Sequence, residues 1–329
     1  MLWLTGPARG ADRLDRFREL AATRLAVPDQ AGADEARREV WGIIDDEVLE
    51  NLGAGGLFAS LPSIRDRLEQ FSDAWGGASL RVSRAGELLV GAFELPGPPA
   101  QGTVRVYRAA GPPPSVLLTL ERAARPTLRA LPATATGAQF LVVWEGPATA
   151  RGSRALSVDL VRQDRDATRV AWSTTRATGD EPLRATAWSV TGVELRVRTE
   201  LAYPGWAPGC ARQTEQEDVY RVAPPPGTVE RAGPRIHDAW HRDARAVAAR
   251  LFDALAAGDQ RALSVLVPDP RLRARLPVLV AAPVCDAVVG RPGEALLLGA
   301  SEFDGRPWSV LLRRSQAGWR VTSAMPVLE

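Results

Sequence analysis

Two histidines, His237 and His241, have the spacing in this sequence that most resembles a metal site. They lie four positions apart in a segment whose apolar pattern predicts a helix, and this spacing would place both imidazoles on one helix face. The glutamate of the zinc motif H-E-x-x-H is absent because position 238 is Asp, and the chain has no third histidine. We therefore interpret the pair as two histidines near a helix start beside an interface, and we predict no metal and no cofactor.

An acidic group precedes these histidines. Glu215, Glu217 and Asp218 follow Cys210 in the run CARQTEQEDVY, and clustered carboxylates can perform acid–base chemistry or bind calcium. The D-x-D-x-D-G spacing of a calcium loop is absent, so we expect these carboxylates on a solvated approach to a strand. The segment 203–210, YPGWAPGC, is interpreted as a rigid, partly apolar loop that either packs over the end of a sheet or binds a partner.

The chain has two cysteines, Cys210 and Cys285, and neither belongs to a C-x-x-C pair. A zinc ribbon and a thioredoxin-type redox motif are thereby excluded. The two positions fall in different predicted domains, and an exported protein could form one disulfide between them. If the protein is cytosolic, both cysteines are expected to be buried as small apolar side chains.

Complete catalytic sets are missing from the sequence. There is no G-x-S-x-G nucleophile elbow, and both histidines that a Ser/His/Asp triad could use lie in one predicted helix. The glycines within 53–56 follow a predicted helix rather than a strand, and the chain contains no lysine. A phosphate-binding loop and a lysine-dependent enzyme are therefore excluded.

The distribution of charged and apolar residues excludes further classes of protein. The 41 basic residues, all arginine, are interspersed with 39 acidic residues, so no basic stripe predicts nucleic-acid binding. No apolar run is long enough to cross a membrane, and the four residues MLWL are too few for the apolar core of a signal peptide. We expect either a cytoplasmic protein or one whose export segment is missing from this start. The scarcity of Lys, Asn and Ile is typical of a bacterium with a GC-rich genome.

The patterning predicts an α+β protein in three parts, at 1–76, 77–230 and 231–329. In the first part, apolar residues repeat every three or four positions, which is typical of amphipathic helices. Three such helices are predicted, at 11–26, 33–52 and 60–75. They would form a small N-terminal helical subdomain.

The period changes to about 2 in 77–230, where about ten short strands alternate with turns rich in Pro and Gly. The clearest strand, 193–203, has apolar residues on one side and charged ones such as Arg196 and Arg198 on the other, typical of an antiparallel strand with one solvated face. We predict an antiparallel, sandwich-like domain. The stretch 223–227, APPPG, is interpreted as a semi-rigid connector to the next domain.

The last part, 231–329, is predicted to contain a long helix at 236–257, a short helix at 260–266 and then about four strands. This order resembles the nuclear-transport-factor-2-like superfamily, whose members have a cone-shaped α+β fold. The resemblance is carried by VAARLFDALAAGDQRALSVLVP at 247–268 and by GWRVTS at 318–323.

Members of that superfamily include isomerases, dehydratases, adaptor modules and small secreted domains, so the resemblance implies a fold more than a function. Its enzymes place a carboxylate, His or Tyr inside the cone. No residue of this chain matches such a catalytic motif. The acids and tryptophans that could line a pocket in the cone are Trp240, Asp286, Glu302, Trp308 and Trp319.

Three functions remain open at this level. The first is a non-enzymatic, extracytoplasmic binding or scaffold protein, with an unidentified protein or small molecule as its partner. The second is a small-molecule enzyme, isomerase- or dehydratase-like, or a ligand carrier, in which Asp286 or Glu302 would be a buried base. The third is a regulatory module whose N-terminal helices bind a partner.

Overall fold

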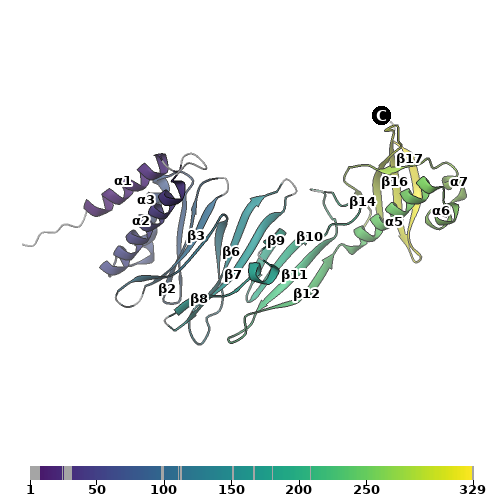
Figure 1. Cartoon of the computed structure of the whole chain (residues 1–329). Coiled ribbons are helices and arrows are strands. Elements are labelled where there is room, and N and C mark those ends of the chain that lie inside the picture. The colour runs from purple at the N-terminus through teal and green to yellow at the C-terminus, as the bar shows by residue number, and fades with distance from the viewer. Residues whose placement is uncertain are drawn as a thin grey trace, which may run out of the picture.

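A computed structural model describes the chain over 8–23, 25, 32–97, 100–109, 111, 113–149, 152–165, 167–179, 181–207 and 209–327. The protein is mixed α+β. Helices lie at one end, antiparallel sheets form the middle, and a helix packed on a further antiparallel sheet forms the other end (Figure 1). In the described part of the chain, none of the helices is long and apolar enough to cross a membrane.

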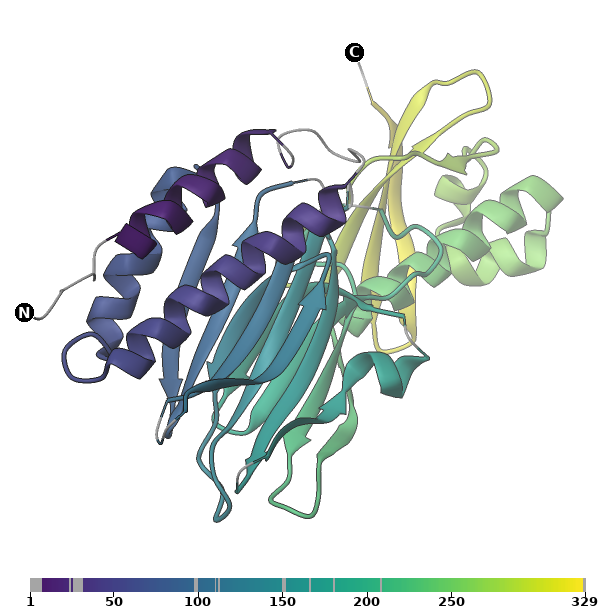
Figure 2. The same cartoon turned by 60° about the vertical axis from the view of Figure 1, so that its left-hand side comes forward.

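The three helices predicted for the N-terminal part are confirmed. They are α1 (Ala8–Thr23), α2 (Ala33–Ala54) and α3 (Leu61–Ala74). The Ser60 hydroxyl starts α3 by accepting a hydrogen bond from the Ser63 N–H at 3.3 Å. Figure 2 shows the helices lying across one face of the first sheet.

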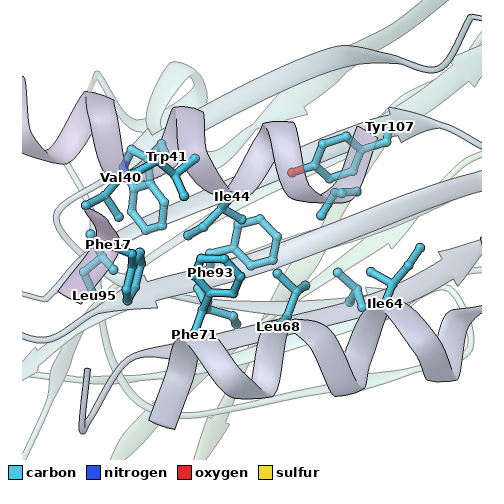
Figure 3. Close-up of a cluster of buried hydrophobic side chains, with 14 of the residues drawn as sticks. Phe17, Val40, Trp41, Ile44, Ile64, Leu68, Phe71, Phe93, Leu95 and Tyr107 are labelled. Atoms are coloured by element: carbon cyan, nitrogen blue, oxygen red, sulfur yellow. The ribbon is translucent and has the colours of Figure 1, made fainter. Parts of the chain in front are cut away.

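This first sheet has the order β1–β2–β3–β4, and its central strands β2 and β3 are buried on both faces. Its strands are β1 (Ser79–Ala85), β2 (Leu88–Leu95), β3 (Gln101–Arg108) and β4 (Ser115–Arg122). Leu89 and Phe93 of β2 point to the helices and pack with side chains such as Leu68 (Figure 3). Leu88 and Val90 point the other way, into a core shared with the second sheet. Because both faces of β2 are buried, its sequence is almost continuously apolar.

The second sheet has the order β12–β11–β10–β9–β7–β6–β5, with β8 paired to β7. A short helix, α4 (Thr174–Thr178), follows β8. The strands are β5 (Arg125–Ala130), β6 (Gln139–Ala148), β7 (Arg154–Asp164), β8 (Ala167–Ser173), β9 (Leu183–Thr191), β10 (Glu194–Glu200), β11 (Glu215–Val222) and β12 (Val229–His237). All of their pairings are antiparallel, as predicted.

The two-sided character of β10 is also confirmed. Leu195 and Val197 are buried in the core of the second sheet. Arg196 and Arg198, on the opposite face, lie close to Glu217 of the neighbouring strand. Cross-strand pairs of opposite charge suit the solvated face of such a sheet.

The interpretation of 223–227 as a connector between domains is wrong. The Ala223 N–H donates to the Thr228 carbonyl at 2.9 Å, which closes a hairpin turn between β11 and β12. Strand β12 then runs to His237 and leads directly into the next helix. A run of prolines looks the same locally in a linker and in a tight turn, and only the pairing of β12 distinguishes them.

The C-terminal part contains α5 (Ala239–Ala257), α6 (Gln260–Leu266) and α7 (Pro270–Arg273), packed on a sheet of order β13–β15–β16–β17 with β14 paired to β15. Its strands are β13 (Val280–Ala281), β14 (Ala287–Val289), β15 (Ala295–Ser301), β16 (Pro307–Ser315) and β17 (Gly318–Pro326). The predicted helix and antiparallel sheet are thus confirmed. The Asp259 carboxylate caps α6 by accepting from the N–H groups of Arg261 and Ala262.

The packing of the N-terminal helices on the first sheet can be tested by mutation of a side chain in their shared core. Leu68→Ala removes a fully buried side chain from their shared core and is expected to lower the free energy of unfolding by about 2–5 kcal/mol. Asp66→Ala, on the exposed side of the same helix, should change it by less than about 0.5 kcal/mol. Denaturant unfolding measures both values, and equal effects of the two variants would contradict this packing.

Candidate functional site

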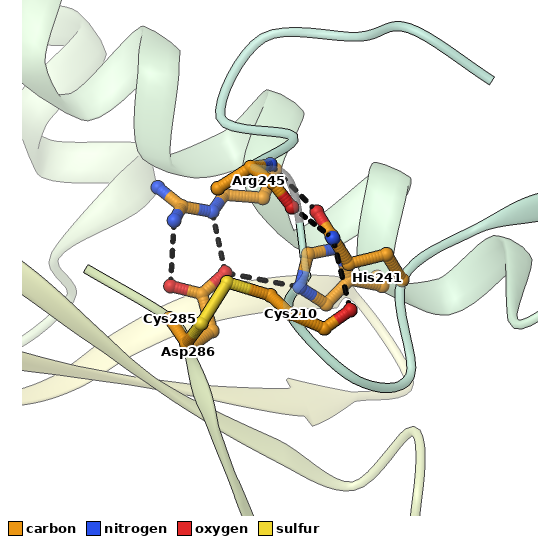
Figure 4. Close-up of a disulfide and its surroundings, with 7 residues drawn as sticks. Cys210, His241, Arg245, Cys285 and Asp286 are labelled. Carbon is orange, nitrogen blue, oxygen red and sulfur yellow. Dashed lines mark hydrogen bonds and ion pairs between the residues drawn. A yellow bond between two sulfur atoms is a disulfide. The ribbon is translucent and has the colours of Figure 1, made fainter. Parts of the chain in front are cut away.

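The densest group of reactive side chains lies where the second sheet meets the C-terminal helix and its sheet (Figure 4). Three segments meet there: the loop between β10 and β11, the first turns of α5, and the segment just before β14. They contribute Tyr203, His241 and Arg245, and Asp286, respectively. The pairs that touch are separated by 38 to 45 positions in the sequence, so tertiary folding brings this site together.

Asp286 is the centre of the site. Both of its carboxylate oxygens accept hydrogen bonds from Arg245, from Nε at 2.5 Å and from Nη2 at 2.6 Å. The His241 Nε2 atom lies 3.0 Å from one of the same oxygens. All three side chains are at most 5 % exposed. The carboxylate and the guanidinium therefore neutralise each other in a site from which water is largely excluded.

The hydrogen bonds continue from His241 to the loop. Its Nδ1 atom lies 2.7 Å from the Tyr203 hydroxyl, which accepts a hydrogen bond from the Thr214 N–H at 3.0 Å. The direction of the Tyr203–His241 hydrogen bond depends on the tautomer of the imidazole. In either tautomer the ring bridges the loop hydroxyl and the Asp286 carboxylate.

Burial raises the pKa of the Tyr203 hydroxyl above its ordinary value, and the nearby charge of Asp286 adds to the rise. The phenol thus keeps its proton at neutral pH.

A disulfide fastens the loop beside this network. Cys210, in the loop, is bonded to Cys285, which directly precedes Asp286, and their Cα atoms are 5.3 Å apart. The cross-link spans 75 positions and joins the β10–β11 loop to the C-terminal part. It therefore holds Asp286 at the distance from the loop that the hydrogen bonds require.

Two backbone features shape the loop around Arg245. A Cβ atom on Gly205 would lie 2.7 Å from the Arg245 Cδ atom, and the φ angle of Gly205 is +82°, so a larger residue fits neither the space nor the conformation. The Thr214 hydroxyl donates to the Asp238 carbonyl at 2.8 Å and accepts from the Arg242 N–H at 3.0 Å. These bonds attach the loop to the start of α5.

The prediction that His237 and His241 share one helix face is wrong. Strand β12 continues to His237, Asp238 adopts a left-handed conformation with φ 49°, and α5 begins only at Ala239. His237 faces the second sheet, 3.5 Å from Glu217, whereas His241 contacts Asp286. Among the described residues, no group of three or more His, Cys, Asp or Glu side chains could hold a metal ion.

The expectation of a solvated acidic group at 215–218 is wrong for two of its three members. Glu217 and Asp218 are buried and only Glu215 remains partly exposed. Arg198 Nε lies 3.3 Å from Glu217, and Arg231 Nη2 donates to Asp218 at 2.7 Å. Strand β12 and the arginines of β10 cover these carboxylates, which local sequence does not reveal.

The pocket candidates lie in a packed region. Trp319 is buried in the C-terminal core, 6.4 Å from the Trp240 ring, and Trp240 donates to the Asp238 carboxylate. Glu302 accepts a hydrogen bond from Trp308 Nε1 at 2.7 Å, outside the network around Asp286. Around the residues that the structure describes, cavities of 680, 540, 380 and 240 Å³ are lined by residues other than these candidates.

Sequence reasoning missed Tyr203 and Arg245 as members of the site. The sequence of the loop that contains Tyr203 indicates only a cover for a sheet end or a partner surface, and Arg245 resembles every other arginine of α5. The local signal was Gly205, which has no Cβ atom and so admits the close approach of Arg245.

The chain of Tyr203, His241 and Asp286 resembles a hydroxyl–imidazole–carboxylate relay. Here, however, the hydroxyl already accepts from Thr214, and the carboxylate is held by two bonds from Arg245. These bonds from Thr214 and Arg245 make the group a rigid joint, because both the hydroxyl and the carboxylate are already held by partners within the protein. Neither a comparison with protein-family models nor one with curated proteins finds a match to this sequence.

Removal of the Asp286 charge is expected to weaken this joint. Asp286→Asn leaves the buried guanidinium of Arg245 without its counter-charge, and we expect a loss of about 3–5 kcal/mol in the free energy of unfolding. Asp243→Asn, on the exposed side of α5, is the matched control. Urea unfolding monitored by tryptophan fluorescence measures both variants, and a loss below about 1 kcal/mol for Asp286→Asn would contradict the joint.

Tyrosine titration gives a second test. Burial raises the pKa of Tyr107, Tyr203 and Tyr220, the three tyrosines of the chain. Because the folded pKa values exceed the unfolded value of about 10, their contribution to stability is complete below pH 10 and is lost as pH rises through the folded values. Absorbance at 295 nm should show little tyrosinate at pH 10 in native protein and a normal titration after denaturation. Coincident curves would contradict the burial.

Proposed function

We propose that this protein is a non-enzymatic, extracytoplasmic binding or scaffold protein, from a bacterium with a GC-rich genome. The observation that carries the proposal is the joint of Tyr203, His241, Arg245 and Asp286, fastened by the Cys210–Cys285 disulfide. Its most reactive side chains are used to hold two parts of the chain together. A rigid arrangement of this kind suits a protein that presents surfaces to a partner.

The disulfide supports a location outside the cytoplasm. Structural disulfides persist in oxidising compartments and are rare in the cytosol of most organisms, where thiols are kept reduced. The cross-link closes a long loop, which is the situation in which a disulfide restricts the unfolded chain most. An exported protein would therefore gain most from this bond.

We also propose the finer description of the fold. The shared core of the first and second sheets supports a sandwich-like central domain between the N-terminal helices and a last domain. Because β12 belongs to the second sheet, the second boundary falls near Asp238 rather than at 230/231. The long helix, the short helix and the antiparallel sheet that follows them support a cone-like domain related to the nuclear-transport-factor-2-like superfamily.

The alternative, an enzyme or ligand carrier with a pocket in the cone, requires an uncompensated carboxylate facing an open space. Asp286 is neutralised by Arg245, Glu302 is bound to Trp308, and Trp319 fills the core. These contacts favour the scaffold. No comparable observation favours the N-terminal helices as a regulatory surface.

Thiol counting tests the compartment. In protein purified from its native host and unfolded in guanidinium without reductant, we expect no free thiol, and two after reduction, since the two cysteines are paired. Two reactive thiols before reduction would contradict the proposal. A Cys210→Ser, Cys285→Ser double variant should lose about 4 kcal/mol of stability, whereas wild-type protein under reductant should approach the same value.

A further inference from the structure

An arginine in the core of the second sheet lacks a counter-charge. Along β7, Leu156, Val158 and Leu160 alternate into the core, and the next inward position is Arg162, which is 6 % exposed. A guanidinium keeps its charge in almost any protein environment. Placing it at the end of an apolar row is costly unless a negative group compensates it.

The described residues supply Arg162 with neutral partners. Its Nε donates to the Gln139 side-chain oxygen at 2.9 Å, and Nη1 and Nη2 donate to the carbonyls of Gly227 and Ala223. No carboxylate of the described residues forms an ion pair with it. These bonds orient the guanidinium and attach it to the β11–β12 turn, but they leave its positive charge in place.

A second arginine increases the local charge. Arg169 of β8 is the residue directly opposite Arg162 in the β7–β8 pairing. Like charges in directly opposed positions destabilise a sheet. Burial and the charge of Arg169 lower the pKa of Arg162. The hairpin therefore carries two positive charges where a sheet would ordinarily place an opposite or an apolar pair.

Both arginines line a cavity of 380 Å³. It lies at the end of the second sheet, and Figure 1 shows the β7–β8 and β11–β12 turns together at that end. Hydrogen-bonding groups of Thr136, Gln163 and Thr228 also line it. The one acidic residue of the lining, Asp164, is exposed and forms no ion pair with either arginine. The cavity thus combines positive charge, hydroxyl groups and room for a small ligand.

We propose that this cavity binds an oxyanion, the phosphate or carboxylate group of a small ligand, between Arg162 and Arg169. A guanidinium has five N–H donors, and Arg162 uses three of them within the protein, which leaves one on each Nη atom. Guanidinium pairs with phosphate or carboxylate oxygens form strong, oriented hydrogen bonds. The bound anion would supply the missing negative charge and relieve the repulsion between the two arginines.

The site is independent of the joint at Asp286. It lies at the opposite end of β12 from His237, and no residue of the cavity belongs to the network around the disulfide. A thiol experiment that contradicts the disulfide would therefore not bear on the proposed anion site. Likewise, an absence of anion binding would not bear on the disulfide.

Binding is tested by isothermal titration calorimetry on the full chain, with sodium phosphate and sodium citrate as separate probes. Sodium chloride at matched ionic strength is the control, because screening alone weakens repulsion between exposed charges. We expect saturable binding of at least one probe and none of chloride. Phosphate alone would assign a phosphate group to the ligand, and citrate alone a carboxylate. Heats indistinguishable from those of chloride for both probes would overturn the proposal.

Substitutions of arginines inside and outside the cavity test whether the anion binds there. Arg169 is exposed, so Arg169→Ala should fold normally and is expected to weaken binding at least tenfold. Arg162→Gln should abolish binding, and circular dichroism establishes whether it folds. Arg184→Ala, an exposed arginine of β9 outside the cavity, should bind like the wild type. Equal affinity of Arg169→Ala and Arg184→Ala would overturn the assignment.

Discussion

The buried carboxylate of Asp286 imposes the constraint on which the junction depends. A charge removed from water must be compensated at close range, and the compensation comes from Arg245 and His241 on α5. To admit Arg245, the loop above it needs a glycine at 205. The Tyr203 hydroxyl of the same loop orients His241. The disulfide beside Asp286 fixes the distance at which all of these contacts form together.

The requirement that a buried charge be compensated distinguishes two buried charged side chains of the second sheet. Asp159 is 2 % exposed, and its carboxylate accepts from Trp144 Nε1 at 2.8 Å and from Arg122 at 3.0 Å. Arg162, nearly as buried, has only neutral acceptors within the described chain. The first charge is compensated by the protein itself, which is typical of a structural group. The second is not, and this difference motivates the proposed anion site.

The arrangement of the joint also bears on function. An enzyme needs reactive groups that a substrate can reach, whereas Tyr203, His241 and Asp286 are each bonded to partners inside the protein. Because these side chains form a rigid connection, the protein surfaces on either side of it keep fixed positions relative to each other. This is the physical basis for proposing a binding or scaffold protein, with the cavity at Arg162 as a place where such a protein would take up a small ligand.

Local periodicity in the sequence was sufficient to predict the three N-terminal helices, the solvated face of β10 and the helix that became α5, because each depends on spacing within one element. It also contained an unused signal at Arg162, since the alternation of Leu156, Val158 and Leu160 places the next residue inward. Tertiary structure alone decided the separation of His237 from His241, the hairpin at 223–227 and the meeting of Tyr203 with Asp286. These features depend on strand pairing and on charge compensation between distant segments, and neither leaves a pattern in neighbouring residues.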